Sequence, residues 1–166
     1  MKIFQKKNDK DGVFNCLLGI GVTYGNIGQD KFPLALQFEN DALKIAIELD
    51  NKIYMAQAYS NIGNTQLSME MDSVKKKLIQ KPLKTLYARS LENYLKSLEL
   101  RKQNGDKREI ANSLGNIGII YTERHEYATA IDYYNQSLSL NKELNNPYEM
   151  VVNLKELGRL NLATGN

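Results

Sequence analysis

Few residues of this chain have the type and spacing that catalysis or metal binding requires. The 166 residues include one histidine, His125, and one cysteine, Cys16, so the sequence offers neither a histidine pair nor a cysteine cluster for a metal ion. Cys16 lies beside Leu17 and is expected to be a small buried apolar residue rather than a nucleophile. Glu123 and Glu126 are expected at helix ends, without an evident acid–base partner. The sequence therefore predicts a protein that is not an enzyme and has no catalytic residue, metal or cofactor.

One glycine-rich stretch, GIGVTYGNIG, mimics a dinucleotide-binding loop. Gly19 and Gly21 have the spacing of the first two glycines of that fingerprint, but the third glycine position is occupied by Tyr24. No strand is expected before the stretch, and the fingerprint requires one. We interpret these glycines as sites where two helices pack closely.

Residues 111–145 have the apolar spacing of two short helices that fold against each other. In each helix one face is formed by residues three or four apart. These residues are Leu114, Ile117, Gly118 and Tyr121 in the first helix, and Ala130, Tyr134 and Ser137 in the second. Gly118 has no Cβ, so the neighbouring helix can approach closely. The pattern predicts an antiparallel helical hairpin.

The first helix of this hairpin recurs along the chain. Its marker glycines are Gly21, Gly63, Gly118 and Gly158, separated by 42, 55 and 40 residues. A Leu or Tyr precedes each glycine by four positions, and an Ile or Leu precedes it directly. One hairpin cannot bury both of its faces, so the copies are expected to stack. Asp106 and Asn146, each with a glutamate three residues later, have the spacing of helix N-caps.

This order of bulky residue, glycine, tyrosine, alanine and aromatic residue resembles the tetratricopeptide repeat family. Repeats of about 40 residues resemble the longer-repeat branch, which includes spindle-orientation scaffolds, kinesin light chains and sensor arrays of bacterial signalling proteins. The resemblance implies an all-α fold, in which αα-hairpins stack into a right-handed superhelix.

The expected organisation is a single array with incomplete ends. Its segments are a tail of a preceding helix at 1–10, repeat 1 at 11–50, repeat 2 at 51–106, repeat 3 at 107–146 and the first helix of an incomplete repeat 4 at 147–166. Repeat 2 contains an insertion at about 69–83, which prolongs its first helix or adds a short one. Terminal helices without partners predict self-association through the ends.

The resemblance also implies a binding surface, because the first helices of such arrays line a concave groove for peptides or helices. The residues expected there are Asn15, Gln57, Ser60, Asn61, Asn64, Asn112, Asn116, Lys155 and Arg159. Amide side chains carry both a donor and an acceptor, so they can pair with almost any peptide backbone. Lys155 and Arg159 lie one turn apart and would suit a carboxylate. The cations are confined to the last repeat, so the family's carboxylate clamp is not expected.

The net charge of +3 is concentrated in one segment. Residues 70–84 contain five lysines, at 75–77, 81 and 84, against Glu70 and Asp72. This run could contact a polyanion through Lys75–Lys84, although a solvated helical extension is the favoured interpretation and a nucleic-acid partner is not expected. No stretch approaches the roughly 20 apolar residues of a membrane span, and the first residues lack the apolar core of a signal peptide. A cytoplasmic location is expected.

Two classes of function remain open from the sequence. The first is a protein–protein interaction scaffold that binds a peptide or helix in its groove. The alternative is a regulatory or sensor input segment of a larger bacterial signalling protein, such as a histidine kinase, nucleotide cyclase or transcription regulator.

Overall fold

The computed structural model describes residues 9–77, 82 and 85–165. Within these residues the chain forms seven α-helices, one 3₁₀ helix and no strand. The helices are α1 (Lys10–Ile27), η1 (Gln29–Lys31), α2 (Phe32–Glu48), α3 (Lys52–Lys75), α4 (Ala88–Asn104), α5 (Lys107–Glu123), α6 (Tyr127–Glu143) and α7 (Pro147–Thr164). The prediction of an all-α fold is confirmed.

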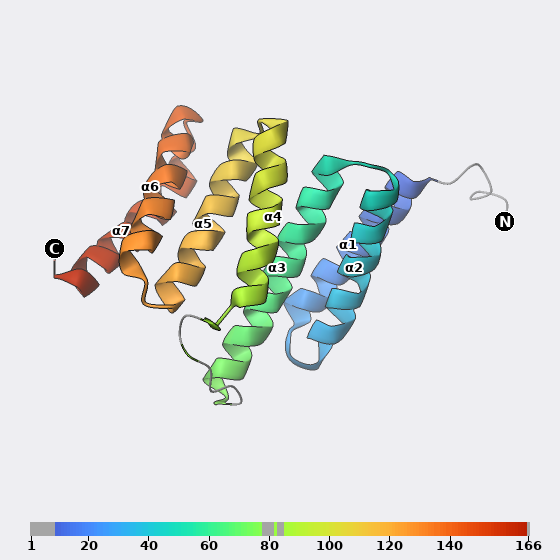
Figure 1. The fold of residues 1–166 in the computed structure, drawn as a ribbon, viewed down its shortest axis with the longest axis horizontal. Helices are drawn as coiled ribbons and strands as arrows, with labels where there is room; N and C mark the ends of the chain where they lie inside the picture. Colours follow the sequence, from blue (N-terminus) through green and yellow to red (C-terminus); the bar gives the residue numbers. More distant parts are fainter. Residues whose placement is uncertain (1–8, 78–81, 83–84, 166) are drawn as a thin grey trace.

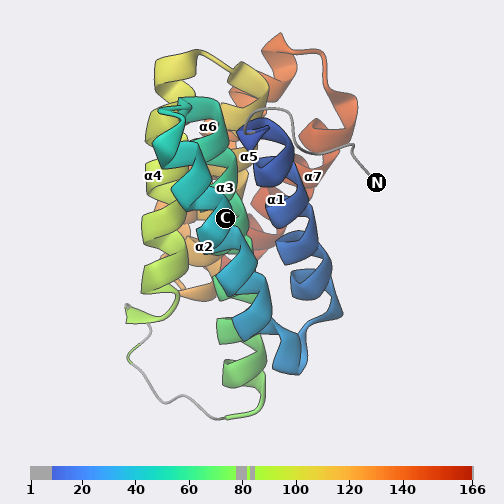
Figure 2. The ribbon, with the colours of Figure 1, turned by 90° about the vertical axis from the view of Figure 1, so that its right-hand side faces the viewer.

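The helices pair into hairpins that stack side by side. Helices α1 and α2, α3 and α4, and α5 and α6 form three antiparallel pairs, and α7 packs against α6. Each second helix also packs against the first helix of the next pair. The array therefore has two layers, with α1, α3, α5 and α7 in one layer and α2, α4 and α6 in the other (Figures 1 and 2). Stacking of αα-hairpins is confirmed.

The connections between hairpins follow one local rule. A residue with positive φ ends the second helix, and the next residue caps the following first helix with its side chain. These pairs are Asp50 and Asn51, Gly105 and Asp106, and Asn145 and Asn146. Asp106 accepts a hydrogen bond from the backbone N–H of Glu109 at 3.1 Å. The N-caps that the sequence predicts at Asp106 and Asn146 are confirmed.

The structure shows how the second hairpin departs from its neighbours. Helix α3 has 24 residues, whereas α1, α5 and α7 have 17 or 18. In its added turns Met71 and Val74 pack against the core cluster around Tyr94, so the described part of the insertion prolongs the first helix. Helix α4 begins at Ala88. The predicted tail of a preceding helix covers residues 1–10, of which 1–8 lie outside the described residues. Asp9 and Lys10 are instead the N-cap and the first residue of α1.

Two of the marker glycines allow a tyrosine of the second helix to pack on the first helix. A Cβ built on Gly63 would lie 3.1 Å from the ring of Tyr94, and one on Gly118 would lie 2.9 Å from the ring of Tyr134. Both rings are buried. Gly158 on α7 has nothing within 4 Å of such a Cβ, because no helix of the described chain packs on that side of it. The glycine is therefore a packing requirement only where a second helix is present.

A hydrogen bond from the second helix accompanies each glycine–tyrosine contact. The hydroxyl of Ser97 donates to the carbonyl oxygen of Ala56 at 2.8 Å, and that of Ser137 donates to the carbonyl oxygen of Ala111 at 2.9 Å. Both serines are buried. Each serine hydroxyl has a backbone acceptor inside the hairpin, so its burial costs little free energy.

The first hairpin places a carboxylic acid where the other two place a tyrosine. Glu39 is 1% exposed and packs on Gly21, where a built Cβ would lie 2.6 Å from Glu39 Cγ. Its Oε1 accepts a hydrogen bond from the hydroxyl of Thr65 at 2.8 Å, whereas Oε2 is buried without a hydrogen-bond partner among the described residues. Burial raises the pKa of Glu39 to about 7, and the hydrogen bond from Thr65 opposes that shift.

Replacing two of the marker glycines by alanine should distinguish the effect of helix packing on stability from the effect of helix propensity. Gly118→Ala is expected to lower the melting temperature, because overpacking against Tyr134 costs about 1–3 kcal/mol and exceeds the propensity gain of about 1 kcal/mol. Gly158→Ala is the matched control and should raise the melting temperature, because its methyl group meets open space. Thermal unfolding followed by circular dichroism measures both changes. A Gly118→Ala protein that melts above wild type would contradict the packing argument.

The buried carboxyl of Glu39 should make stability depend on pH. Because its pKa in the fold lies above the ordinary value, the fold binds the proton more tightly, and stability falls as pH rises from about 4.5 to 7. The loss amounts to a few kcal/mol, from about 1.4 kcal/mol for each pH unit between the two pKa values.

The difference in unfolding free energy between wild type and Glu39→Gln, from denaturant titrations between pH 4 and 8, isolates this loss. Glu99→Gln, at an exposed position on α4, serves as the control. If the Glu39→Gln difference were as flat with pH as the control difference, the carboxyl would not be protonated preferentially in the fold.

Candidate peptide-binding groove

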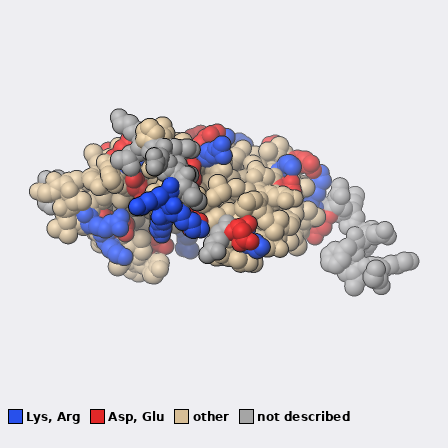
Figure 3. All heavy atoms as spheres, turned by 90° about the horizontal axis from the view of Figure 1, so that it is seen from below, with Lys and Arg blue, Asp and Glu red and all other residues tan. Residues whose placement is uncertain are grey.

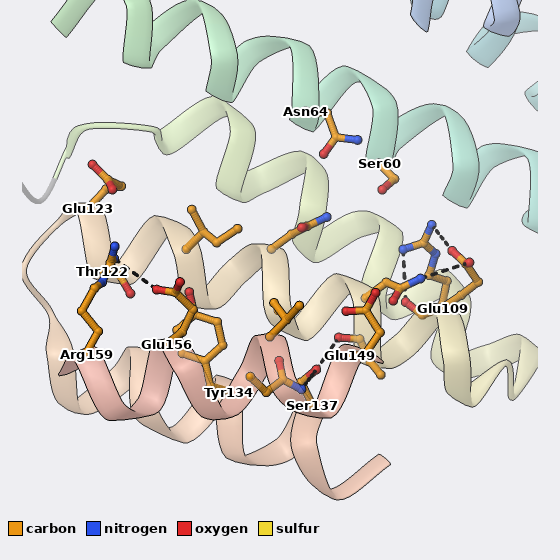
Figure 4. Close-up of a pocket in the computed structure, with 18 residues that line it drawn as sticks. Ser60, Asn64, Glu109, Thr122, Glu123, Tyr134, Ser137, Glu149, Glu156 and Arg159 are labelled. Carbon is orange, nitrogen blue, oxygen red and sulfur yellow. Dashed lines mark hydrogen bonds and ion pairs between the residues drawn. The ribbon is translucent and has the colours of Figure 1, made fainter. Parts of the chain in front are cut away.

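An open groove of about 600 Å³ runs along the layer of first helices, between α3, α5 and α7. Its floor is completed by residues of α4 and α6. The lining residues are Ser60, Asn64, Arg101, Glu109, Ala111, Asn112, Gly115, Asn116, Ile119, Thr122, Glu123, Tyr134, Ser137, Glu149, Val152, Asn153, Glu156 and Arg159 (Figure 4). Most of these side chains are polar, so the groove is suited to a ligand that itself offers hydrogen bonds.

Five of the nine sequence-predicted site residues line this groove. They are Ser60, Asn64, Asn112, Asn116 and Arg159. Ser60 was expected to face outward, but it is only 7% exposed and belongs to the floor. The structure thus brings together residues of three successive first helices that are far apart in the sequence.

The other four predicted residues lie elsewhere. Gln57 borders a neighbouring hollow beside Arg101, and Asn61 borders a small pocket of about 80 Å³ next to Glu39. Asn15 is exposed on α1, beside Cys16. Lys155 is exposed on α7 and is not among the lining residues.

Amide side chains of α3 and α5 line the groove. Asn112 and Asn116 of α5 are half-buried, which leaves their side chains accessible to a ligand. Asn64 of α3 is exposed and its Oδ1 accepts a hydrogen bond from the hydroxyl of Tyr94 at 2.6 Å. That bond orients the amide, so its N–H₂ group remains available as a donor.

The sequence missed a second set of polar residues in the floor. Asn153 is 3% exposed and donates to the hydroxyl oxygen of Ser137 at 3.1 Å. Arg101 is 7% exposed, and its guanidinium contacts the hydroxyl of Ser113 at 2.6 Å and the carboxylate of Glu109 at 2.6 Å. The repeat could have indicated Asn153, because it stands forty residues after Ser113 and so occupies the same position of the next repeat.

Burial lowers the pKa of Arg101, and the nearby carboxylates of Glu109 and Asp106 oppose the shift. An arginine side chain stays protonated in proteins, so Arg101 is a buried cation whose charge is balanced inside the protein. It is therefore part of the structure of the floor rather than a free cation for an anionic ligand.

The expectation that Lys155 and Arg159 together bind a carboxylate stays a prediction. Arg159 lines the groove, but its guanidinium pairs with the carboxylate of Glu156 at 3.2 Å. Lys155 is exposed and is not among the lining residues.

Among the described residues, one buried polar atom of the groove makes no hydrogen bond of ordinary length and angle. The hydroxyl of Tyr134 is buried and makes no hydrogen bond among the described residues, although the side chain lines the groove. Burial raises the pKa of this hydroxyl, and the neighbouring hydroxyl of Thr122 partly opposes that shift. The group is neutral and can act as a donor or as an acceptor. In Figure 4 the ring lies between the two ends of the groove, near Glu156.

The lysine run lies away from the groove, at the end of α3. Lys75, Lys76 and Lys77 are exposed, and Lys76 pairs with Asp72 at 2.7 Å. The remaining two lysines, at 81 and 84, lie outside the described residues. Seen from below, basic side chains gather in one group on this face, and acidic side chains lie nearby (Figure 3).

Several further expectations can be compared with the described part of the chain. Cys16 is exposed, so its predicted burial is wrong. No group of three His, Cys, Asp or Glu side chains among the described residues is placed to hold a metal ion. Each helix described is too short or too polar to span a bilayer. Apolar side chains of α7, including Tyr148, Val151 and Leu162, are exposed, and self-association through the terminal helices stays a prediction.

Sequence comparison places the middle of the chain in a known family. Residues 84–143 match the tetratricopeptide repeat family. Over 58 residues the chain is 40% identical to the photosystem I assembly protein Ycf3 of Rippkaea orientalis and 41% identical to that of Acaryochloris marina. The aligned segment is 35% of this chain and 32% or 33% of those proteins, so the chain spans about a third of the length of these relatives.

Two solved structures share the architecture. The apo form of RapI superposes with a TM-score of 0.77 at 22% identity, over 96% of this chain and 40% of that one. BtubC from P. vanneervenii superposes with a TM-score of 0.69 at 17% identity, over 98% of this chain and 60% of that one. Residues 84–143 therefore have the sequence of tetratricopeptide repeats, and the described hairpins beside them share their helical-repeat fold.

Proposed function

We propose that this chain is an interaction scaffold that binds an extended segment of another protein in the groove between α3, α5 and α7. Tetratricopeptide repeats generally mediate protein–protein interaction, and helical-repeat proteins of this kind are typically non-enzymatic. The observation that carries the proposal is the row of amides from successive first helices, Asn64, Asn112 and Asn116, along one open groove.

An extended segment suits this groove for physical reasons. Its backbone presents an N–H and a C=O at each residue, and these groups need partners when they leave water. An amide side chain supplies both a donor and an acceptor. Helix α5 has 17 residues and is therefore about 26 Å long, which matches seven or eight extended residues at about 3.3 Å each.

The rigidity of the groove also favours binding. Its lining residues come from packed helices, and the floor is held by buried hydrogen bonds such as that between Ser137 and Asn153. A preformed site loses little conformational entropy when the ligand binds. The curated relatives are named as assembly proteins, and a scaffold that holds another chain would be consistent with work of that kind.

Filling the groove should abolish binding. Peptides selected on the wild-type protein from a phage-displayed library of random linear peptides serve as the probe. Asn116→Trp is expected to weaken their binding at least about tenfold, or about 1.4 kcal/mol, because an indole at this half-buried position occupies the ligand's space. Asn135→Trp, at an exposed position on α6, is the control and should bind as wild type does.

A double substitution that removes two amide groups from the groove provides the complementary test. Asn112→Ala with Asn116→Ala removes both amides and replaces them with a better helix former, so helicity by circular dichroism should be unchanged while binding weakens. If the selected peptides bound the tryptophan variant and the double alanine variant as tightly as wild type, the groove would not be the binding site.

A further inference from the structure

The charges along the groove are unequal. Four carboxylates line it, those of Glu109, Glu123, Glu149 and Glu156, against the two guanidiniums of Arg101 and Arg159. Each guanidinium is engaged by a carboxylate of the groove, Arg101 by Glu109 at 2.6 Å and Arg159 by Glu156 at 3.2 Å. The groove therefore has an excess of two negative charges after its internal pairs are counted.

The two remaining carboxylates stand at opposite ends of the groove. Glu123 lies at the C-terminal end of α5 and Glu149 in the first turn of α7, and Figure 4 shows them on opposite sides of Tyr134. Both side chains are half-buried, and neither forms an ion pair within the described part of the chain. A partly desolvated carboxylate gains free energy from a cation placed beside it.

A second feature of the groove also indicates an unfilled ligand contact. The hydroxyl of Tyr134 is buried, lines the groove and has no hydrogen-bond partner among the described residues. A buried hydroxyl without a partner is costly, and its place between Glu123 and Glu149 lies on the path of a segment that reaches both. A donor group of the ligand, from its backbone or a basic side chain, could satisfy this oxygen.

We propose that the segment bound in this groove is cationic, with one lysine or arginine beside Glu123 and another beside Glu149. This inference rests on the proposed function and specifies its ligand. Glu149 occupies in α7 the position of Glu109 in α5, forty residues earlier, and Glu123 lies fourteen residues beyond Glu109. Fourteen helical residues rise about 21 Å, so the two basic residues of an extended segment are about six positions apart.

The charges near the site are compatible with this ligand. Arg159, 60% exposed, lies at the same end of the groove as Glu123 (Figure 4), and its charge is offset by the paired carboxylate of Glu156. Lys155 is outside the lining. An anionic segment would instead place its charge between Glu123 and Glu149, because both groove cations are already occupied.

Four synthetic peptides labelled with a neutral fluorophore test the charge preference. One has arginines separated by five neutral residues, the second has glutamates at these positions, the third has glutamines, and the fourth has the two arginines adjacent. Fluorescence anisotropy at low salt should show the spaced arginine peptide binding at least about tenfold more tightly than the glutamine peptide. The glutamate peptide should be the weakest, and the adjacent arginines should bind less tightly than the spaced ones. Added salt should weaken binding of the spaced arginine peptide.

Two double variants locate the interaction. Glu123→Gln with Glu149→Gln is expected to reduce the affinity for the spaced arginine peptide about tenfold, and to reduce it more than the affinity for the glutamine peptide. Glu92→Gln with Glu99→Gln removes two exposed carboxylates of α4 and is the matched control, expected to bind as wild type does. Equal loss in both double variants would mean non-specific attraction and would overturn the proposal.

The results also separate this proposal from the proposed function. If the glutamine or glutamate peptide binds as tightly as the arginine peptide, and Asn116→Trp prevents that binding, the groove binds peptides but the charge preference is wrong. If library-selected peptides bind the groove while none of the four peptides does, the charge proposal fails and the proposed function stands. If Asn116→Trp leaves all peptide binding unchanged, both fail.

Discussion

The close approach of the two helices in each hairpin is the contact on which the rest of the structure depends. It needs a glycine on the first helix, so that a large side chain of the second helix can pack against the backbone. That side chain is a tyrosine at Gly63 and Gly118, and Glu39 at Gly21. It also needs a small side chain one turn further along the second helix, where Ser137 donates to a backbone carbonyl of the first helix. The hairpin buries its inner face in this way and leaves its two sides for neighbouring hairpins. The wall of first helices, and therefore the groove, follows from that stacking.

The repeat period and the local rules made most of the fold predictable. Glycine spacing located the first helices, and the capping residues Asp106 and Asn146 located two helix starts, because both signals depend on neighbours within one or two turns. The groove was less predictable. Repeat alignment assigns a residue to a helical face but not to a depth, which depends on the tilt of the adjacent helix. Hence Ser60 belongs to the floor, and Lys155 lies outside the groove although Arg159 lines it.

The groove residues that could not be identified from the sequence have one physical feature in common. Arg101 and Asn153 are polar and lie at positions that a pattern search counts as neither core nor surface. Their burial is tolerable only because partners from other helices, Glu109 and Ser137, meet them in the fold. Cys16 shows the reverse error, since its expected burial followed from its apolar neighbour Leu17 and not from a partner helix. Side chains whose environment depends on contacts between hairpins cannot be placed from periodicity alone.

Glu39 and Tyr134 pack on equivalent marker glycines but differ in how each accommodates a buried oxygen atom. Both side chains sit on a marker glycine, and both keep one oxygen without a hydrogen bond among the described residues. Burial of Glu39 favours the protonated form of its carboxyl group. A tyrosine hydroxyl is already neutral, so Tyr134 has no such adjustment, and a group from outside the hairpin could satisfy its oxygen. Because Tyr134 lies on the groove between two unpaired carboxylates, the group that relieves it and the group that neutralises them can belong to the same ligand.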